Sequence, residues 1–167
     1  MKTIFILLSI LAHISLSAQD KNEAKLHIGV EVPIGEFARS TTIGVGVYET
    51  YYIEMPGKKA ISISTGCSVL SDQFDNKLTG YIIPISLGKQ CMVSKLFYIQ
   101  GEGGIEWFFG KFPHSIDANV ALSVGSLLKV KHGKVDLNFK YSLTNKINCN
   151  SRFIVGLGFQ DVFHLHR

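Results

Sequence analysis

The chain has 167 residues, a formal net charge of +4 and a charged fraction of 18%. This mild positive charge is not gathered into a basic stripe, which argues against a nucleic-acid partner. The chain holds 16 glycines, 11 phenylalanines and 6 tyrosines but only 4 prolines, a composition that favours an all-β protein over a helical or disordered one.

Residues 1–18 have the three-part layout of a secretory signal peptide. Lys2 precedes an apolar run from Ile4 to Leu11, and small residues lead to Ala18. The apolar run is shorter than the roughly 20 residues that a membrane-spanning helix needs. We therefore expect cleavage after Ala18, a mature domain over residues 19–163 and a tail over residues 164–167. The alternative is an uncleaved helical anchor.

Eight runs of alternating apolar and small or polar residues divide the mature chain, and none shows helical periodicity. They cover residues 25–32, 41–54, 58–70, 78–90, 95–109, 115–130, 134–144 and 151–163. This pattern predicts an all-β fold, an eight-stranded antiparallel up-and-down β-barrel. Pro84 lies within the fourth run and lacks a backbone donor, so we expect a bulge there.

The composition of the two strand faces decides which face points outward. A soluble barrel hides its apolar face, whereas a transmembrane barrel exposes it. The polar face here is made largely of glycine and serine, such as Ser62, Ser64 and Gly66. Such small residues suit the crowded interior of an eight-stranded barrel, and most runs reach the 9–11 residues that a tilted strand needs to cross a bilayer. We therefore predict a transmembrane barrel rather than a soluble one.

The connections between the runs alternate in length. Residues 55–58, 91–94 and 131–134 form tight turns, and the other connections, at 33–40, 71–77, 110–114 and 144–150, are mostly longer. Outer-membrane barrels pair short periplasmic turns with longer outer loops. Aromatic side chains anchor such barrels at the two membrane interfaces. We assign Trp107, Phe108 and Phe109 to the outer interface, and Tyr51, Tyr52, Phe97 and Tyr98 to the inner one. Phe163 is a further predicted interface aromatic.

The predicted inward face carries charged residues. In the run from Phe97 to Phe109, the even positions Glu102 and Glu106 point into the lumen. Buried charges are costly unless they are paired, so other inward positions must supply partners. The full predicted network is His27, Glu31, Glu102, Glu106, Asp117, Lys129, Asp136, Lys140 and Arg152. We interpret it as a structural ion-pair core that plugs the lumen. The alternatives are a gated polar path and a catalytic cluster.

Three features resemble a known family in their order along the chain. They are Pro33-x-Gly35-Glu36-Phe37 after the first run, Ile83-Pro84 in a middle run, and Tyr98-x-x-x-Glu102-x-Gly104. These residues resemble the small outer-membrane β-barrel domain family of Gram-negative bacteria, whose members are eight-stranded, opacity- and OmpW-like.

The resemblance covers roughly residues 25–160 and implies an eight-stranded barrel in the cell outer membrane, mostly of unassigned activity. Such barrels commonly end on an aromatic residue that the barrel-insertion machinery recognises. Here four residues follow Phe163, so we expect Phe163 to act from an internal position.

Three functions are compatible with such a barrel. The first is a structural or interaction role, with outer-membrane lipid around the barrel and a protein or small ligand at the outer loops. The second is a narrow channel for small apolar molecules. The third is a lipid A-modifying enzyme, which on similar barrels uses a His-x-Ser-Asn stretch. Here the nearest segment is Ser142-Leu143-Thr144-Asn145, which lacks the histidine that would activate a nucleophile. We therefore expect no enzymatic activity.

No metal or cofactor motif stands out in the sequence. Cys67, Cys91 and Cys149 match no metal-ligand spacing, and the pair His164 and His166 supplies only two ligands where a site needs more. There is no phosphate-binding loop, dinucleotide fingerprint or nucleophile elbow. We expect neither a metal site nor a cofactor.

Overall fold

The computed structural model describes residues 22–39, 41–72, 78–110, 114–130, 133–144 and 150–160. The described elements are β1 (Asn22–Ile34), the 3-10 helix η1 (Gly35–Arg39), β2 (Thr41–Met55), β3 (Lys59–Asp72), β4 (Leu78–Met92), β5 (Phe97–Gly110), β6 (Ser115–Val130), β7 (Gly133–Thr144) and β8 (Asn150–Gln160). The predicted signal peptide, the tail at residues 164–167 and Phe163 lie outside the described residues.

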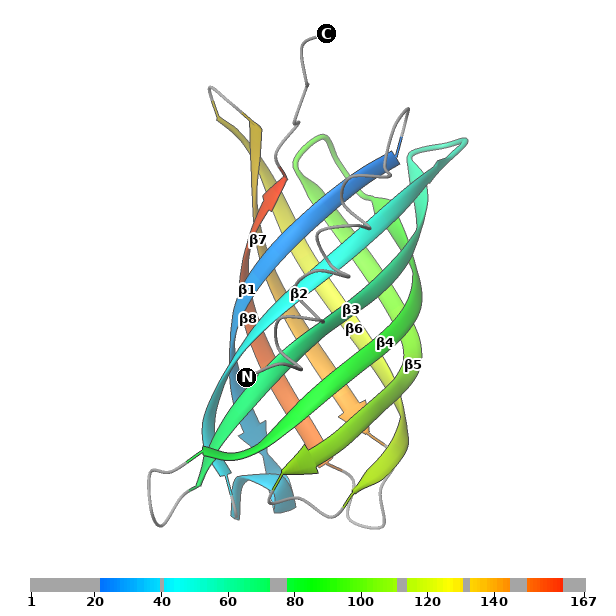
Figure 1. Cartoon of the computed structure of the whole chain (residues 1–167). Coiled ribbons are helices and arrows are strands. Elements are labelled where there is room, and N and C mark those ends of the chain that lie inside the picture. Colours follow the sequence, from blue (N-terminus) through cyan, green and yellow to red (C-terminus); the bar gives the residue numbers. More distant parts are fainter. Residues whose placement is uncertain are drawn as a thin grey trace, which may run out of the picture.

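The eight strands form one closed barrel (Figure 1). Each strand pairs antiparallel with the next strand in the sequence, and β1 closes the barrel by pairing with β8 from Leu26 opposite Phe159 to Ile34 opposite Ser151. The predicted eight-stranded antiparallel up-and-down topology is therefore confirmed. The strand boundaries agree with the predicted runs to within about three residues, and β6 begins and ends where the sequence pattern does.

The two ends of the barrel contain different structural elements. β1 begins and β8 ends at the upper end in Figure 1, together with the turns β2–β3 and β4–β5. The helix η1 lies at the opposite end. We call these the inner end and the outer end. The β2–β3 turn is tight because Gly57 and Lys58 both take positive φ angles, of 80° and 59°, a geometry typical of a short hairpin turn.

The outward surface of the barrel is apolar. On β6, Ile116, Val120, Leu122 and Val124 are exposed, while Asn119 and Ser123 are buried. Every strand repeats this arrangement, with large exposed aliphatic or aromatic residues pointing outward. Because a water-soluble monomer rarely exposes so large a continuous apolar surface, the outward face requires a lipid environment. Within the described residues, no helix is long and apolar enough to span a membrane.

Glycines on the inward face allow the walls and side chains to approach closely. A Cβ atom added at Gly104 would lie 2.1 Å from the carbonyl oxygen of Ile85 on β4, and one at Gly125 would lie 2.3 Å from Cζ of Tyr98. Both distances are far below van der Waals contact. The narrow lumen therefore tolerates no side chain at these two positions.

The predicted bulge at Pro84 is wrong. Pro84 stands opposite Glu106 in an unbroken β4–β5 ladder. On the β3 side, pairing is absent between Thr65–Ile85 and Ser68–Ile82, but the register is the same before and after this gap. The missing proline N–H thus interrupts the ladder without inserting a residue. The register shifts occur instead near the outer end, between Thr41 and Gly44 of β2 and between Leu70 and Ser71 of β3.

The substitution Gly104→Ala tests the tight inward packing. Its added methyl group would meet the β4 backbone, which cannot rotate away, so we expect the free energy of unfolding to fall by about 1–3 kcal/mol. Gly103→Ala is the matched control, because Gly103 points outward and the nearest atom to an added Cβ is 3.9 Å away. It should leave stability unchanged or slightly raised. Urea titration of the refolded protein in detergent micelles, followed by Trp107 fluorescence, measures both. Equal losses in the two variants would contradict the packing argument.

Candidate functional site in the barrel lumen

An outer cluster of charges is built around Arg152 of β8. Its Nη1 atom donates a hydrogen bond to Oε2 of Glu31 on β1 over 2.9 Å, and its Nη2 atom donates to Oε1 of Glu106 on β5. All three side chains are almost fully buried. One guanidinium therefore bridges two carboxylates from different strands across the lumen, a geometry that the planar fork of arginine suits well.

Neutral groups complete the outer cluster. Asn119 Nδ2 donates to Glu106 over 2.8 Å, and Thr144 Oγ1 donates to the second oxygen of Glu106 over 2.7 Å. The hydroxyl of Tyr48 donates to Glu31. The carboxylates thus accept bonds from several strands as well as from Arg152, which offsets much of the cost of removing two charges from water.

A middle layer lies next along the lumen. Lys140 of β7 forms an ion pair with Glu102 of β5, and Gln100 Nε2 donates to the other oxygen of Glu102. Beside this pair, Asn138 Nδ2 and His27 Nδ1 lie 3.0 Å apart in a hydrogen bond. The Lys140–Glu102 pair joins β7 to β5, and the Asn138–His27 bond joins β7 to β1. The middle layer therefore connects these three strands.

An inner cluster closes the other half of the lumen. Lys25 Nζ of β1 lies 3.2 Å from Oδ2 of Asp136 on β7, and the Tyr98 hydroxyl lies 2.9 Å from both oxygens of Asp136. The ammonium of Lys25 also lies 4.4 Å from the centre of the Tyr52 ring, a favourable cation–π geometry. At the rim, Lys134 pairs with Glu23 over 3.1 Å.

Two glycines of β8 allow the β1 and β7 side chains to meet. A Cβ atom at Gly158 would lie 2.6 Å from Nδ1 of His27, and one at Gly156 would lie 2.4 Å from Oδ1 of Asn138. Strand β8 lies between β1 and β7. A side chain at Gly156 or Gly158 would therefore stand between His27 of β1 and Asn138 of β7, which bond to each other across β8. The Gly156–Leu157–Gly158 segment therefore positions the middle and inner layers of the network.

An apolar plug closes the outer end. Phe37 of η1 packs in a buried cluster with Leu70 of β3, Ile82 of β4 and Phe108 of β5. Thr41 Oγ1 donates to the backbone carbonyl of Phe37 over 2.6 Å and holds the short helix in place. Sequence reasoning placed Phe37 only within a loop motif. Leu70, Ile82 and Phe108 all lie at even-numbered positions, which face inward on β3, β4 and β5. These apolar residues on an otherwise polar face are the signal that could have identified the plug.

A small cavity of about 40 Å³ lies between the charged layers. Its walls include His27, Tyr52, Glu102 and Lys140 as well as Pro84 and Ile154, so polar and apolar groups both line it. A water molecule needs roughly 10–15 Å³ of such volume, which leaves room for only a few. A cavity of this size is too small for a substrate larger than a few water molecules.

The structure brings together most of the predicted network residues but not all of them. His27, Glu31, Glu102, Glu106, Asp136, Lys140 and Arg152 all line the lumen in these layers. The other two predicted members lie near the two ends of β6. Lys129 is exposed at the inner end of β6, because it lies beyond the last buried inward position. Asp117 is half-buried near the outer end of β6 and accepts a hydrogen bond from Ser115 over 2.9 Å.

Sequence reasoning missed several lumen residues that complete the network. Lys25 lies at an odd-numbered position of β1, as His27 and Glu31 do, and these positions face inward. That shared spacing could have identified Lys25 as a lumen residue. Tyr48 and Asn119 were also missed, because neutral polar residues on a predicted inward face do not by themselves indicate a charge partner. Their role depends on the register between strands, which brings Asn119 within bonding distance of Glu106.

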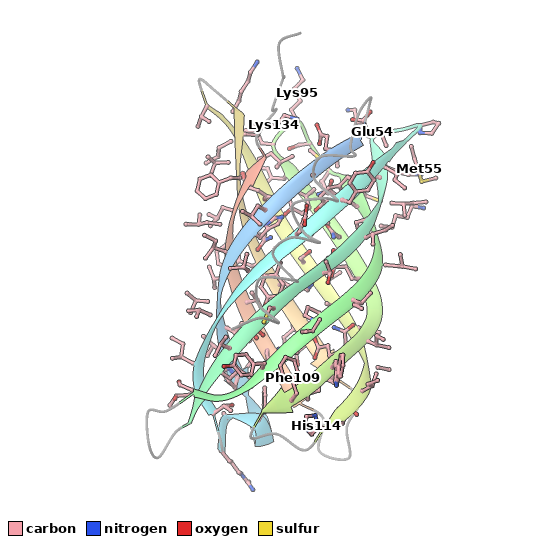
Figure 2. The ribbon with its side chains drawn as sticks, viewed as in Figure 1. Glu54, Met55, Lys95, Phe109, His114 and Lys134 are labelled. Atoms are coloured by element: carbon pink, nitrogen blue, oxygen red, sulfur yellow. The ribbon has the colours of Figure 1, made fainter. Side chains whose placement is uncertain are left out.

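The predicted interface aromatics divide into two groups. Phe97 and Trp107 are exposed on the outward face, and Phe109 stacks on Tyr81 with ring centres 5.2 Å apart. Figure 2 shows Phe109 close to the outer end. Tyr51 is half-buried on the outward face of β2. Tyr52 is a correction: it points into the lumen, is only 3% exposed and donates to Gln100 over 2.9 Å.

Tyr52 lies inward because the strand period of two places neighbours on opposite faces. The adjacent pair Tyr51–Tyr52 therefore cannot share one interface. Tyr98 and Phe108 are further corrections for the same reason, because both point into the barrel and are 2% and 1% exposed. Phe163, the remaining predicted interface aromatic, lies outside the described residues.

The described residues hold no group of three or more histidine, cysteine, aspartate or glutamate side chains that could bind a metal ion. Cys67 and Cys91 are unpaired thiols on β3 and β4. Cys149, His164 and His166 lie outside the described residues. Ser142 and Thr144, from the stretch compared with lipid A-modifying barrels, point into the lumen and donate to Glu106.

Solved structures with the same fold are transmembrane β-barrels. A de novo designed transmembrane β-barrel matches with a TM-score of 0.52 and 13% identity, over 85% of this chain and 98% of the other. The Yersinia pestis outer-membrane protein Ail in a phospholipid nanodisc matches at 0.53 and 13%, over 84% and 99%. The crystal structure of Ail, the attachment invasion locus protein, matches at 0.54 and 11%, over 83% and 96%.

At this level of identity the comparison establishes the fold alone. The chain is an all-β protein, an eight-stranded antiparallel transmembrane β-barrel. No family model matches the chain, and a search of curated proteins finds no relative.

The substitution Arg152→Gln tests the outer cluster. It leaves Glu31 and Glu106 buried without their cation, so we expect the free energy of unfolding to fall by about 3–5 kcal/mol. Lys129→Gln, at an exposed position, is the control and should change stability by less than about 0.5 kcal/mol. The triple variant Glu31→Gln/Glu106→Gln/Arg152→Gln removes all three charges and should recover much of the loss. Urea unfolding measures all three, and a loss below about 1 kcal/mol for Arg152→Gln would show that the cluster is not a paired unit.

Proposed function

We propose that the mature chain, residues 19–163, is an integral barrel of the Gram-negative outer membrane with a structural or interaction role. Export requires the signal peptide expected at residues 1–18. In this proposal, residues 164–167 are a C-terminal tail. This proposal places the protein among the small outer-membrane β-barrels that its sequence motifs resemble, and it assigns no enzymatic activity to the chain.

The buried ion pairs of the lumen are the observation that carries this proposal. Charged pairs occupy the inner, middle and outer layers, and Lys25, Glu31, Glu106, Asp136 and Arg152 are each at most 3% exposed. The apolar plug around Phe37 covers the outer layer. Such a lumen favours a barrel that presents its surface and loops to partners over one that conducts solutes.

The apolar outward face supports a location in lipid, and the fold is shared with Ail of Yersinia pestis, an outer-membrane protein. Ail has also been crystallised with the heparin analogue sucrose octasulfate. By analogy, we propose that the partners of this chain are outer-membrane lipid, the insertion machinery during assembly, and a protein or small ligand at the outer loops. The insertion machinery would recognise Phe163.

The two alternative functions have less support. A narrow channel for small apolar molecules requires a dry apolar pocket near the outer rim, but the apolar side chains described there pack against one another around Phe37. A lipid A-modifying enzyme requires a histidine beside a hydroxyl at the lipid boundary. Ser142 instead faces the lumen and bonds to Glu106, where a lipid substrate cannot reach it.

Heat-modifiable gel mobility tests the membrane assignment. A folded transmembrane barrel resists SDS until it is boiled, because its backbone hydrogen bonds are satisfied within the closed sheet. The mature protein, extracted from outer-membrane fractions, should therefore migrate differently before and after heating. A protein that stays soluble without detergent and shows no heat shift would instead be a soluble barrel.

Planar-bilayer recording tests the filled lumen. The purified barrel, first shown to be folded by its heat shift, should give no steady ion conductance, because every charged layer would have to break before an ion could pass. A 16-stranded porin, whose wider lumen holds an aqueous channel, serves as the positive control. Steady single-channel currents from the wild-type protein would reject the plugged lumen and favour a channel.

A further inference from the structure

Four lysines gather at the inner end of the barrel on the side formed by β3, β4 and β5. We call Lys58, Lys59, Lys89 and Lys95 the lysine patch. All four side chains are exposed. Figure 2 shows Lys95 at the inner end, the same end as Glu54 and Met55, which lead into the β2–β3 turn. None of the four belongs to the lumen network, so the patch requires a separate explanation.

Backbone contacts bring the lysine patch together. The carbonyl oxygen of Lys58 accepts a hydrogen bond from the Met92 N–H over 3.0 Å, which joins the β2–β3 turn to the end of β4. Lys59 stands opposite Cys91 in the β3–β4 ladder, and Lys89 lies two residues before Cys91 on the same outward face. The two side chains are therefore diagonal neighbours about 7 Å apart. Lys95 lies in the turn between β4 and β5.

The positive charge of this patch is not balanced. Within the described part of the chain, no ion pair involves any lysine of the patch. Glu54, near the end of β2, is the acidic residue closest in sequence. Elsewhere at the inner end, by contrast, Lys134 is paired with Glu23 over 3.1 Å. Neighbouring like charges repel one another, so the patch favours an anionic ligand.

Apolar side chains surround the lysine patch. Val93 and Phe97, on either side of Lys95, are 67% and 57% exposed. Leu87, two residues before Lys89 on the outward face of β4, is 63% exposed. Beside Lys89, Gly101 of β5 also points outward, and a Cβ atom there would have no atom within 4 Å. Cationic groups next to exposed apolar surface are typical of the zone where lipid headgroups meet acyl chains.

The depth of Lys89 identifies the class of ligand. Lys89 precedes the end of β4 by three residues, which in a strand tilted by about 45° is about 7 Å along the barrel axis. Its backbone therefore lies within the apolar band, and its flexible stem reaches toward the rim. A soluble protein or a free anion cannot approach that position in a membrane, whereas a lipid phosphate can.

We propose that the lysine patch is a binding site for the phosphate groups of anionic phospholipids in the leaflet at the inner end of the barrel. Lys59 and Lys89 contact the headgroup from neighbouring strands, and Lys58 and Lys95 contribute from the two turns. The open surface beside Gly101 accommodates part of an acyl chain. This proposal rests on the proposed membrane function, but it adds a lipid selectivity that the fold alone does not require.

Lipid selectivity in reconstituted vesicles tests the site. The mature protein is placed in phosphatidylcholine vesicles with trace spin-labelled phosphatidylglycerol or spin-labelled phosphatidylcholine, and electron paramagnetic resonance gives the motionally restricted fraction of each. We expect the wild type to favour phosphatidylglycerol severalfold at low salt. Lys59→Gln/Lys89→Gln should lower this preference by about fivefold or more, because each lysine near an anionic surface contributes substantially. Raising the salt to 0.5 M should weaken the wild-type preference through screening.

The matched control is Arg39→Gln/Lys129→Gln, which removes the same charge from positions outside the patch and should keep the wild-type selectivity. Adding inorganic phosphate at millimolar concentration should not displace the labelled lipid, and displacement would identify a free anion as the ligand. A heat-shifted, folded barrel without lipid preference, or equal losses in both double variants, would overturn the site and leave the membrane function standing. Failure of the wild type to fold into vesicles would overturn both.

Discussion

The constraint on which the structure depends is the width of an eight-stranded barrel. Such a lumen is just wide enough to be filled by side chains, so charged groups inside it must find one another rather than bulk water. Arg152 satisfies Glu31 and Glu106 at once, and Lys25 satisfies Asp136. The pairs Arg152–Glu106, Lys25–Asp136 and Lys140–Glu102 join β8 to β5, β1 to β7 and β7 to β5. They therefore tie together strands that the sheet ladder does not join.

Filling the lumen with long charged side chains demands small residues on the facing wall. β2, β3 and β4 supply this wall with serine, threonine and glycine, including the buried Ser62, Ser64 and Ser86. At position 104 of β5 even serine is too large, because an added Cβ would meet the backbone of the neighbouring strand β4. The inward glycines Gly104, Gly125, Gly156 and Gly158 are thus a consequence of close packing inside the barrel.

Strand parity explains how far the sequence could predict the site. The period of two assigned most inward positions correctly, including Glu102 and Arg152, because a one-residue error would have placed every apolar side chain in the lumen. Parity cannot say where a strand leaves the buried zone, so Lys129 was placed inside although it is exposed. Nor does it supply the cross-strand register that brings Asn119 to Glu106 or Tyr98 to Asp136. Tyr52 was assigned to the membrane interface because it is aromatic, although its position along β2 faces the lumen.

The inward and outward faces of the barrel have different roles. Among the described residues, the charged groups of the inward face pair with one another, and the cavity beside them holds only about 40 Å³. Among the described residues, no ion pair involves the four lysines at the inner end of the outward face. Side chains that point away from a closed sheet contact the surroundings instead. Interaction with lipids and other molecules therefore depends on the outward face and the loops, while stability depends on the lumen. Substitutions in the two regions should accordingly have nearly independent effects, as expected for groups that share no partners.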